Sequence, residues 1–179
     1  MSPIGRAVLA VASAAILGSA CSVQSAAKLP NPQETLQEAD ESYGETDYGT
    51  AGRLYRSLLG ESPAPCPIPY LHLQIGRCLQ AGKSFVLARA EYEVVMANPV
   101  DLVASDSAFF ERYGYPKAEA QFGIAECYEA EGRWEEALSA YQASRDKYPR
   151  WHWCGSCKYS RQQRVLDRIA RLLRQLDGK

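Results

Sequence analysis

Two cysteines separated by two residues, Cys154 and Cys157, are the side chains of this sequence best suited to chemistry. The thiolate is the reactive form of cysteine. A pair at the start of a helix places one sulfur near the positive end of the helix dipole, which lowers its pKa. The spacing leaves three interpretations open: a structural disulfide that clips neighbouring elements together, a redox-active dithiol, or part of a metal or haem site. We favour the disulfide, because no second Cys-x-x-Cys is present to complete a zinc site, although folding could bring Cys66 near.

The string Trp153–Lys158 resembles the active-site string of thioredoxins, with Ser156 where that family has proline. The resemblance implies that Cys154 is the attacking thiol and Cys157 the resolving thiol, with Lys158 adding positive charge. The resemblance is confined to this string. A thioredoxin fold needs a strand before the motif and further strands with a cis-proline loop after it, and only 21 residues follow Lys158. The pair is therefore a redox alternative without the thioredoxin fold.

The rest of the sequence carries no recognisable catalytic set. The two histidines, His72 and His152, lack a serine-nucleophile motif, and no glycine-rich phosphate loop occurs. The chain of 179 residues has a net charge of −1, whereas nucleic-acid binders carry a basic excess. We therefore expect a protein that is not an enzyme, with no metal, no cofactor, no small-molecule substrate and no nucleic-acid partner.

The composition indicates one folded domain with an uneven charge distribution. Hydrophobic residues make up 46% of the chain and charged residues 23%, which supplies a core and excludes an intrinsically disordered protein. Residues 158–179 carry seven Lys and Arg against two Asp, a net charge of +5. Because the whole chain is close to neutral, an acidic body must precede this basic tail.

The N-terminus is typical of a secretory signal peptide covering residues 1–20. Arg6 is followed by the uncharged, mostly apolar stretch Ala7–Ala20, which is shorter than the roughly 20 residues that a membrane-spanning helix needs. The stretch Leu17–Cys21 resembles the lipobox of bacterial lipoproteins, although Gly18 stands where that family has leucine. The resemblance implies that Cys21 is lipidated, that residues 21–32 form a tether, and that the protein is an outer-membrane lipoprotein facing the periplasm. Ordinary cleavage after Ala20 would instead release a soluble periplasmic protein.

The body of the chain shows a helical repeat, clearest over residues 118–151. Trp134, Ala137 and Tyr141 follow the spacing of one helix face, Gly132 breaks the chain before them, and Pro149 ends the helix. This pattern resembles the tetratricopeptide repeat (TPR), a pair of helices of about 34 residues.

Two further copies precede this repeat, over residues 33–65 and 69–102. The aligned alanines are Ala51, Ala88 and Ala137, and the turn glycine is replaced by Thr46 in the first copy and stands one place early, as Gly82, in the second. An insertion over residues 103–117 separates the second and third copies. The sequence therefore predicts an all-α, TPR-type solenoid of about three helix pairs over residues 33–157. Small residues twelve positions before each aligned alanine should let helices approach closely: Ala39, Gly76 and Ala125.

Residues 158–179 predict an amphipathic helix that caps the solenoid, because the last pair needs a cover with one solvated face. Its apolar arc holds Val165, Leu166, Ile169, Leu172, Leu173 and Leu176. Its arginines fall on the opposite arc, which we interpret as a solvated face. Contact with acidic lipid headgroups or with an acidic partner is the alternative.

The resemblance to TPR proteins implies a groove, formed by the first helix of each pair, that binds an extended or helical segment of another envelope protein. Carried onto this chain, the groove residues are Leu36, Asp40, Tyr43, Tyr70, Leu73, Arg77, Gln80, Phe122, Glu126 and Glu129. Three carboxylates beside a single arginine make this groove acidic, so we expect it to prefer a segment with Lys or Arg. A fixed structural subunit of an envelope complex is a second alternative, beside the redox protein.

The remaining cysteines and the insertion give two further expectations. Cys78 and Cys127 occupy the same position in their repeats, ten residues before the aligned alanine, and we expect both to be buried and unreactive. The insertion brings together Phe109, Phe110, Tyr113 and Tyr115. We expect these aromatic residues to pack on the solenoid, with a second contact surface as the alternative.

Overall fold

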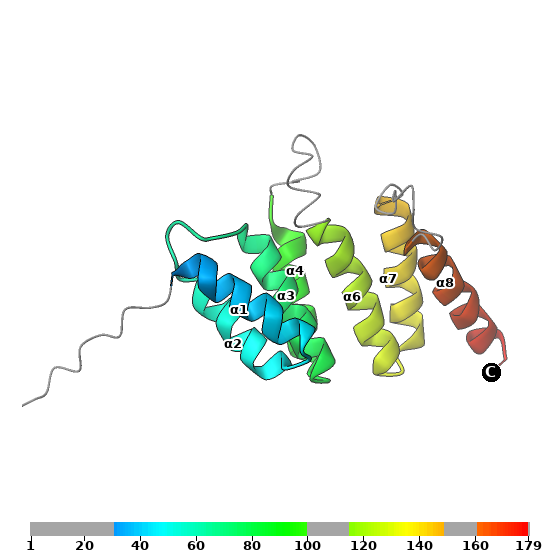
Figure 1. The fold of residues 1–179 in the computed structure, drawn as a ribbon. Coiled ribbons are helices and arrows are strands. Elements are labelled where there is room, and N and C mark those ends of the chain that lie inside the picture. Colours follow the sequence, from blue (N-terminus) through cyan, green and yellow to red (C-terminus); the bar gives the residue numbers. More distant parts are fainter. Residues whose placement is uncertain (1–30, 100–114, 149–160, 179) are drawn as a thin grey trace, which may run out of the picture.

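The computed structural model describes residues 31–99, 115–148 and 161–178. In this part of the chain every regular element is a helix (Figure 1). The helices in chain order are α1 (Pro32–Gly44), α2 (Tyr48–Leu58), α3 (Ile68–Ala81), α4 (Phe85–Ala97), α6 (Pro116–Ala130), α7 (Trp134–Lys147) and α8 (Arg161–Asp177). The signal peptide, the tether up to residue 30, most of the insertion and the pair Cys154–Cys157 lie outside the described residues.

The helices stack in three pairs followed by a single last helix. Within the pairs α1 packs on α2, α3 on α4, and α6 on α7, while α2 contacts α3, α4 contacts α6, and α7 contacts α8. Figure 1 shows this row running from α1 to α8. Each helix pair therefore covers its remaining apolar face by packing against the next pair, and contacts of this kind stabilise a solenoid. The prediction of an all-α solenoid with a C-terminal capping helix is confirmed.

The turn between the two helices of each pair has the same backbone conformation in all three pairs. Thr46, Lys83 and Gly132 have φ angles of 66°, 61° and 74°, and each lies five residues before the aligned alanine. The left-handed residue of the second pair is thus Lys83, so Gly82 is not the equivalent of Gly132. Glycine is the residue best suited to this conformation, which costs other residues about 1–2 kcal/mol.

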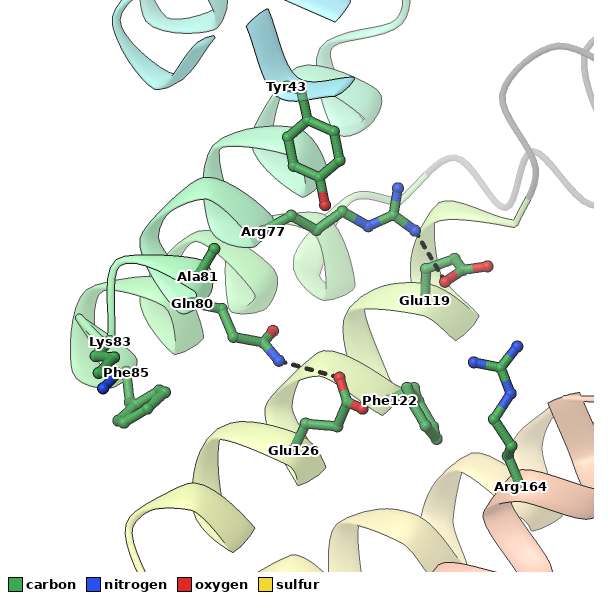
Figure 2. Close-up of a pocket in the computed structure, with 10 residues that line it drawn as sticks. All are labelled: Tyr43, Arg77, Gln80, Ala81, Lys83, Phe85, Glu119, Phe122, Glu126 and Arg164. Atoms are coloured by element: carbon green, nitrogen blue, oxygen red, sulfur yellow. Dashed lines mark hydrogen bonds and ion pairs between the residues drawn. The ribbon is translucent and has the colours of Figure 1, made fainter. Parts of the chain in front are cut away.

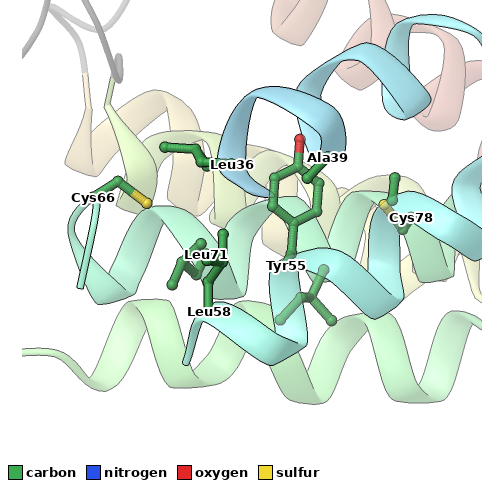
Figure 3. Packing of buried hydrophobic residues seen from close by; sticks show 9 residues of the cluster. Leu36, Ala39, Tyr55, Leu58, Cys66, Leu71 and Cys78 are labelled. Carbon is green, nitrogen blue, oxygen red and sulfur yellow. The ribbon is translucent and has the colours of Figure 1, made fainter. Parts of the chain in front are cut away.

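A buried tyrosine occupies the centre of each helix pair. Tyr55, Tyr92 and Tyr141 are 0%, 1% and 0% exposed and lie four residues after the aligned alanines. Figure 3 shows Tyr55 between Ala39 of α1 and the leucines of the first core. The hydroxyl groups of the three tyrosines reach the first helix of their pair, where they donate to Asp40 at 2.6 Å, Gln80 at 2.7 Å and Glu129 at 2.8 Å. The ring fills the core while the hydroxyl group finds a polar partner.

Close helix approach depends most on two glycines around Tyr92. A Cβ added to Gly76 of α3 would lie 2.5 Å from the Tyr92 ring, and one added to Gly123 of α6 would lie 2.6 Å from it. Both distances are far below van der Waals contact, so the ring passes directly against two backbones. Ala39 and Ala125 are fully buried. The predicted role of the small residues is confirmed, and Gly123 adds one that the repeat pattern did not indicate.

The last helix buries only part of the apolar arc expected for it. Val165, Ile169 and Leu172 are buried against the core of the third pair, whereas Leu166 and Leu173 are 39% and 42% exposed. The predicted arc is wider than the surface that α7 and α6 offer, because a single covering helix has a neighbour on one side only. In the described residues, no helix is both long and apolar enough to cross a membrane.

Candidate functional site

A hollow of about 600 Å³ lies along the first helices of the three pairs and is closed at one end by α8. Figure 2 shows the side chains that line it. They come from α1, α3, the turn before α4, α4, α6 and α8: Tyr43, Arg77, Gln80, Ala81, Lys83, Phe85, Glu119, Phe122, Glu126 and Arg164. We call this hollow the groove. A smaller hollow of about 360 Å³ continues from it along α6, and shares Gln80 and Glu126 with it.

Half of the residues expected in the groove do line it. These are Tyr43, Arg77, Gln80, Phe122 and Glu126. Glu129 lines the smaller hollow beside Arg168. Each of the first helices therefore contributes residues from one of its faces to the groove, as the repeat pattern predicts.

Four expected residues lie elsewhere. Leu36 and Leu73 are only 4% and 1% exposed, because their side chains face the second helix of their own pair and belong to the core. Their assignment to the groove is wrong. Asp40 and Tyr70 do not line the groove; they contact each other at 3.5 Å where the first two pairs meet. Tyr70 also accepts a hydrogen bond from Gln74 at 2.6 Å.

The carboxylates of the groove are already paired within the protein. Arg77 binds Glu119 at 2.9 Å, and Gln80 donates to Glu126 at 3.0 Å (Figure 2). The side chains of Glu119 and Glu126 are only 12% and 31% exposed. The expectation of an acidic groove fails here, because it counted carboxylates without their internal partners.

The C-terminal helix supplies several of these partners. Arg168 donates to both carboxylate oxygens of Glu129, at 2.9 and 3.0 Å, and approaches Glu126 at 3.9 Å. Arg171 also binds Glu129. Glu129 thus accepts from two arginines and from the Tyr141 hydroxyl, while its side chain is only 13% exposed. The interpretation of the arginine arc as a purely solvated face is wrong for Arg168 and Arg171, which pair with Glu129 of α6 although Arg171 remains half exposed.

Two cations of the groove have no acidic partner in the part of the chain that the structure describes. Lys83 and Arg164 line the groove, both are exposed, and no ion pair joins either of them to another described residue. Figure 2 shows the Arg164 guanidinium pointing into the groove toward Glu119 and Phe122. Sequence reasoning missed both residues. The regular placement of arginines on α8 was visible, but which arginines reach the groove depends on how α8 lies against α6.

Aromatic rings give the groove an apolar part. Tyr43, Phe85 and Phe122 line it, and Phe122 packs edge-on against the buried Tyr141 with ring centres 5.4 Å apart. Burial raises the pKa of Tyr43, so its hydroxyl is a neutral donor and acceptor at physiological pH. Aromatic residues beside arginine are the combination that most often carries binding energy in protein interfaces.

The two repeat cysteines are confirmed to be buried. Cys78 is 5% and Cys127 0% exposed. Burial raises the pKa of the Cys78 thiol to about 11 and that of Cys127 to about 12, from an ordinary value of 9.0. Both are therefore thiols rather than reactive thiolates at neutral pH. Cys66 is also buried, in the first core cluster (Figure 3). No cluster of His, Cys, Asp and Glu suited to a metal ion occurs among the described residues.

Comparison with known proteins supports the repeat assignment. Residues 119–150, which span most of α6 and all of α7, match the family model described as Tetratricopeptide repeat. A comparison with curated protein sequences gives no match. TPR helix pairs commonly form protein-binding surfaces, which favours a role in protein–protein interaction. The fold is a short helical solenoid of the tetratricopeptide-repeat type, with α6–α7 as the matched repeat.

Proposed function

We propose that this protein is an adaptor or scaffold of the bacterial cell envelope that binds another protein through its groove. One observation carries the proposal: a groove that runs along the first helices of the pairs gathers three aromatic rings and two cations without acidic partners among the described residues. The partner is an extended or helical segment, because such a segment can follow the row formed by α1, α3 and α6.

The sequence of the N-terminus supports the location. A cleaved signal peptide over residues 1–20 would export the chain, and lipidation of Cys21 would hold it at the outer membrane. Residues 22–30 would then separate the anchor from α1. Labelling with a lipid precursor tests this part: we expect the label on the natural chain and none on Cys21→Ser. A chain that is exported without taking up the label would be soluble in the periplasm.

Site-specific photo-cross-linking in cells tests the binding role. A photoreactive amino acid at Phe122, inside the groove, should give a discrete cross-linked protein. The same amino acid at Glu135, which is exposed on the outer helix α7, is the matched control and should give none. The double variant Arg77→Ala, Tyr43→Ala should remove the cross-link at residue 122. A cross-link that survives this variant, or equal labelling from both positions, would show that the groove is not the binding surface.

A second candidate function depends on the sequence around Cys154 and Cys157 alone: thiol–disulfide exchange in the periplasm. The reduction potential of this pair, measured by thiol trapping in redox buffers, separates the two roles. A value below about −300 mV is expected of a structural disulfide, whereas about −270 to −120 mV is the range of exchange proteins. A fixed structural subunit would instead give one stoichiometric partner in purified complexes.

A further inference from the structure

We propose that the C-terminal helix α8 reverses the charge of the groove, so that the groove selects an acidic segment with an apolar side chain. This inference rests on the proposed binding function and names the chemistry of the partner. It replaces the expectation of a basic segment, which followed from the carboxylates of the first helices alone.

The charges that line the two hollows change sign when α8 is counted. Without α8 they are Arg77 and Lys83 against Glu119, Glu126 and Glu129, an excess of one negative charge. The helix adds Arg164 and Arg168 to the lining and Arg171 as a partner of Glu129. The result is an excess of one positive charge in the lining, and of two when Arg171 is included.

An incoming Lys or Arg would find its possible partners occupied. Glu119 is held by Arg77, and Glu129 by two arginines of α8. Glu126 accepts from Gln80 and lies 3.9 Å from Arg168. A basic side chain would have to displace one of these internal partners, and a displaced arginine beside a new cation is unfavourable.

An incoming carboxylate, in contrast, would find donors that have no acidic partner. Arg164 reaches the groove from α8, on the side of Phe122. Lys83 reaches it from the turn before α4, beside Phe85 (Figure 2). Guanidinium groups bind carboxylates through two parallel hydrogen bonds, which gives geometric as well as electrostatic selection. The aromatic rings between the two cations would accept an apolar side chain of the same segment.

The test compares two blocked pentapeptides, one with four glutamates around a phenylalanine and one with four lysines around it. Binding to the purified protein is followed by NMR titration, in which signals of Phe122 and Arg164 locate the peptide. We expect the acidic peptide to bind about tenfold more tightly, and less tightly as salt increases. Tighter binding of the basic peptide at these residues would overturn the inference and leave the groove as the binding surface.

Charge reversal on α8 provides the matched variants. Arg164→Glu should weaken the acidic peptide about tenfold and strengthen the basic one. Arg174→Glu makes the same change in charge on the same helix at a residue that lines neither hollow, and should change the affinity less than about twofold. Neither arginine makes an ion pair with another described residue, so both variants should fold, which circular dichroism checks.

Equal effects of the two variants would show that overall charge and not the groove attracts the peptide, and would overturn the inference. If neither peptide binds at millimolar concentration, the inference fails as well. The cross-link at residue 122 then decides separately whether the groove binds a protein at all.

Discussion

The two junctions between successive helix pairs are built differently. At the first, α3 presents Leu71, Ile75 and Cys78 to the leucines and Tyr55 of the first pair, which makes an apolar junction. At the second, polar bonds cross from α3 and α4 to α6 and the residue that caps it: Arg77 to Glu119 at 2.9 Å, Gln80 to Glu126 at 3.0 Å and Arg89 to the cap residue Glu131 at 2.5 Å. We call this the charged junction.

The charged junction also contains a stacked aromatic group. The guanidinium groups of Arg89 and Arg133 each lie 4.5 Å from the centre of the Tyr128 ring, and both contact Glu131. Arg89 comes from the second pair, whereas the other three residues belong to the third. Cation–π contacts of this kind add about 0.5–2 kcal/mol each.

The difference explains where the groove lies. Arg77, Gln80, Glu119 and Glu126 both cross the charged junction and line the groove. At the apolar junction Tyr70 contacts Asp40 at 3.5 Å, and neither residue lines the groove. The same residues in the second half of the solenoid therefore join two repeats and line the groove.

The largest contrast between the junctions should come from glycine substitutions. Gly123→Ala places a Cβ 2.6 Å from Tyr92 in the charged junction, whereas Gly52→Ala meets Cys78 at an ordinary 3.4 Å in the apolar junction. We expect Gly123→Ala to lower the free energy of unfolding by about 1–3 kcal/mol through overpacking. Gly52→Ala should leave it unchanged or raise it by up to about 1 kcal/mol, because alanine favours the helix. Urea unfolding measures both, and equal effects would contradict the difference in packing.

Removal of Arg89 should be the next largest effect. Arg89→Ala leaves Glu131 without its nearest cation and exposes one face of Tyr128, so we expect a loss of about 2 kcal/mol. Arg53→Ala on α2 is the matched control, because Arg53 is exposed and bonds only to Thr50 of its own helix among the described contacts. That control should change stability by less than about 0.5 kcal/mol. A double-mutant cycle with Glu131→Gln should recover a coupling above about 1 kcal/mol. Additivity of the two changes would show that the pair contributes nothing.

Alkaline pH should weaken both junctions through one buried thiol in each. The raised pKa values of Cys78 and Cys127 mean that the folded protein keeps protons that the unfolded chain releases near pH 9. The contribution of each thiol to the free energy of unfolding is therefore fully present below pH 9. It is lost as the pH rises toward 11 for Cys78 and toward 12 for Cys127. Each thiol contributes a fall of at most about 1.4 kcal/mol per pH unit. Urea unfolding at pH 8 and pH 10 measures the loss, which Cys78→Ala and Cys127→Ala should each reduce. A slope that neither variant changes would assign the loss to the buried tyrosines.

Salt should have the smallest effect, and of the two junctions the charged one should respond more. The Arg77–Glu119 pair is partly exposed, at 30% and 12% of its side chains, so we expect 0.5 M NaCl to lower stability by less than about 1 kcal/mol. Glu119→Gln should reduce this salt dependence. Leu71→Ala, in the apolar junction, should lower stability by several kcal/mol without changing the salt dependence. A changed salt dependence in Leu71→Ala would show that the apolar junction contributes to it as well.

The sequence by itself determined the repeat and most of its core. The spacing of Ala51, Ala88 and Ala137 marks the three pairs, and it places Cys78 and Cys127 correctly in the interior. The turn of the second pair is an exception, because the sequence suggests Gly82 as the turn residue and the structure gives the left-handed conformation to Lys83. These features follow from the helical period, which decides which residues share a face of one helix.

Only the tertiary structure decided what each face meets. Leu36 and Leu73 share a helix with true groove residues, but the angle between paired helices turns them into the core. Arg168 and Arg171 look solvated along the helix, yet the position of α8 over α6 brings them to Glu129. Gly123 is needed because Tyr92 of a neighbouring pair passes against it. The helical period assigns residues to the faces of a single helix. The charge and shape of the groove depend on how several helices stack, and no local sequence pattern gives that arrangement.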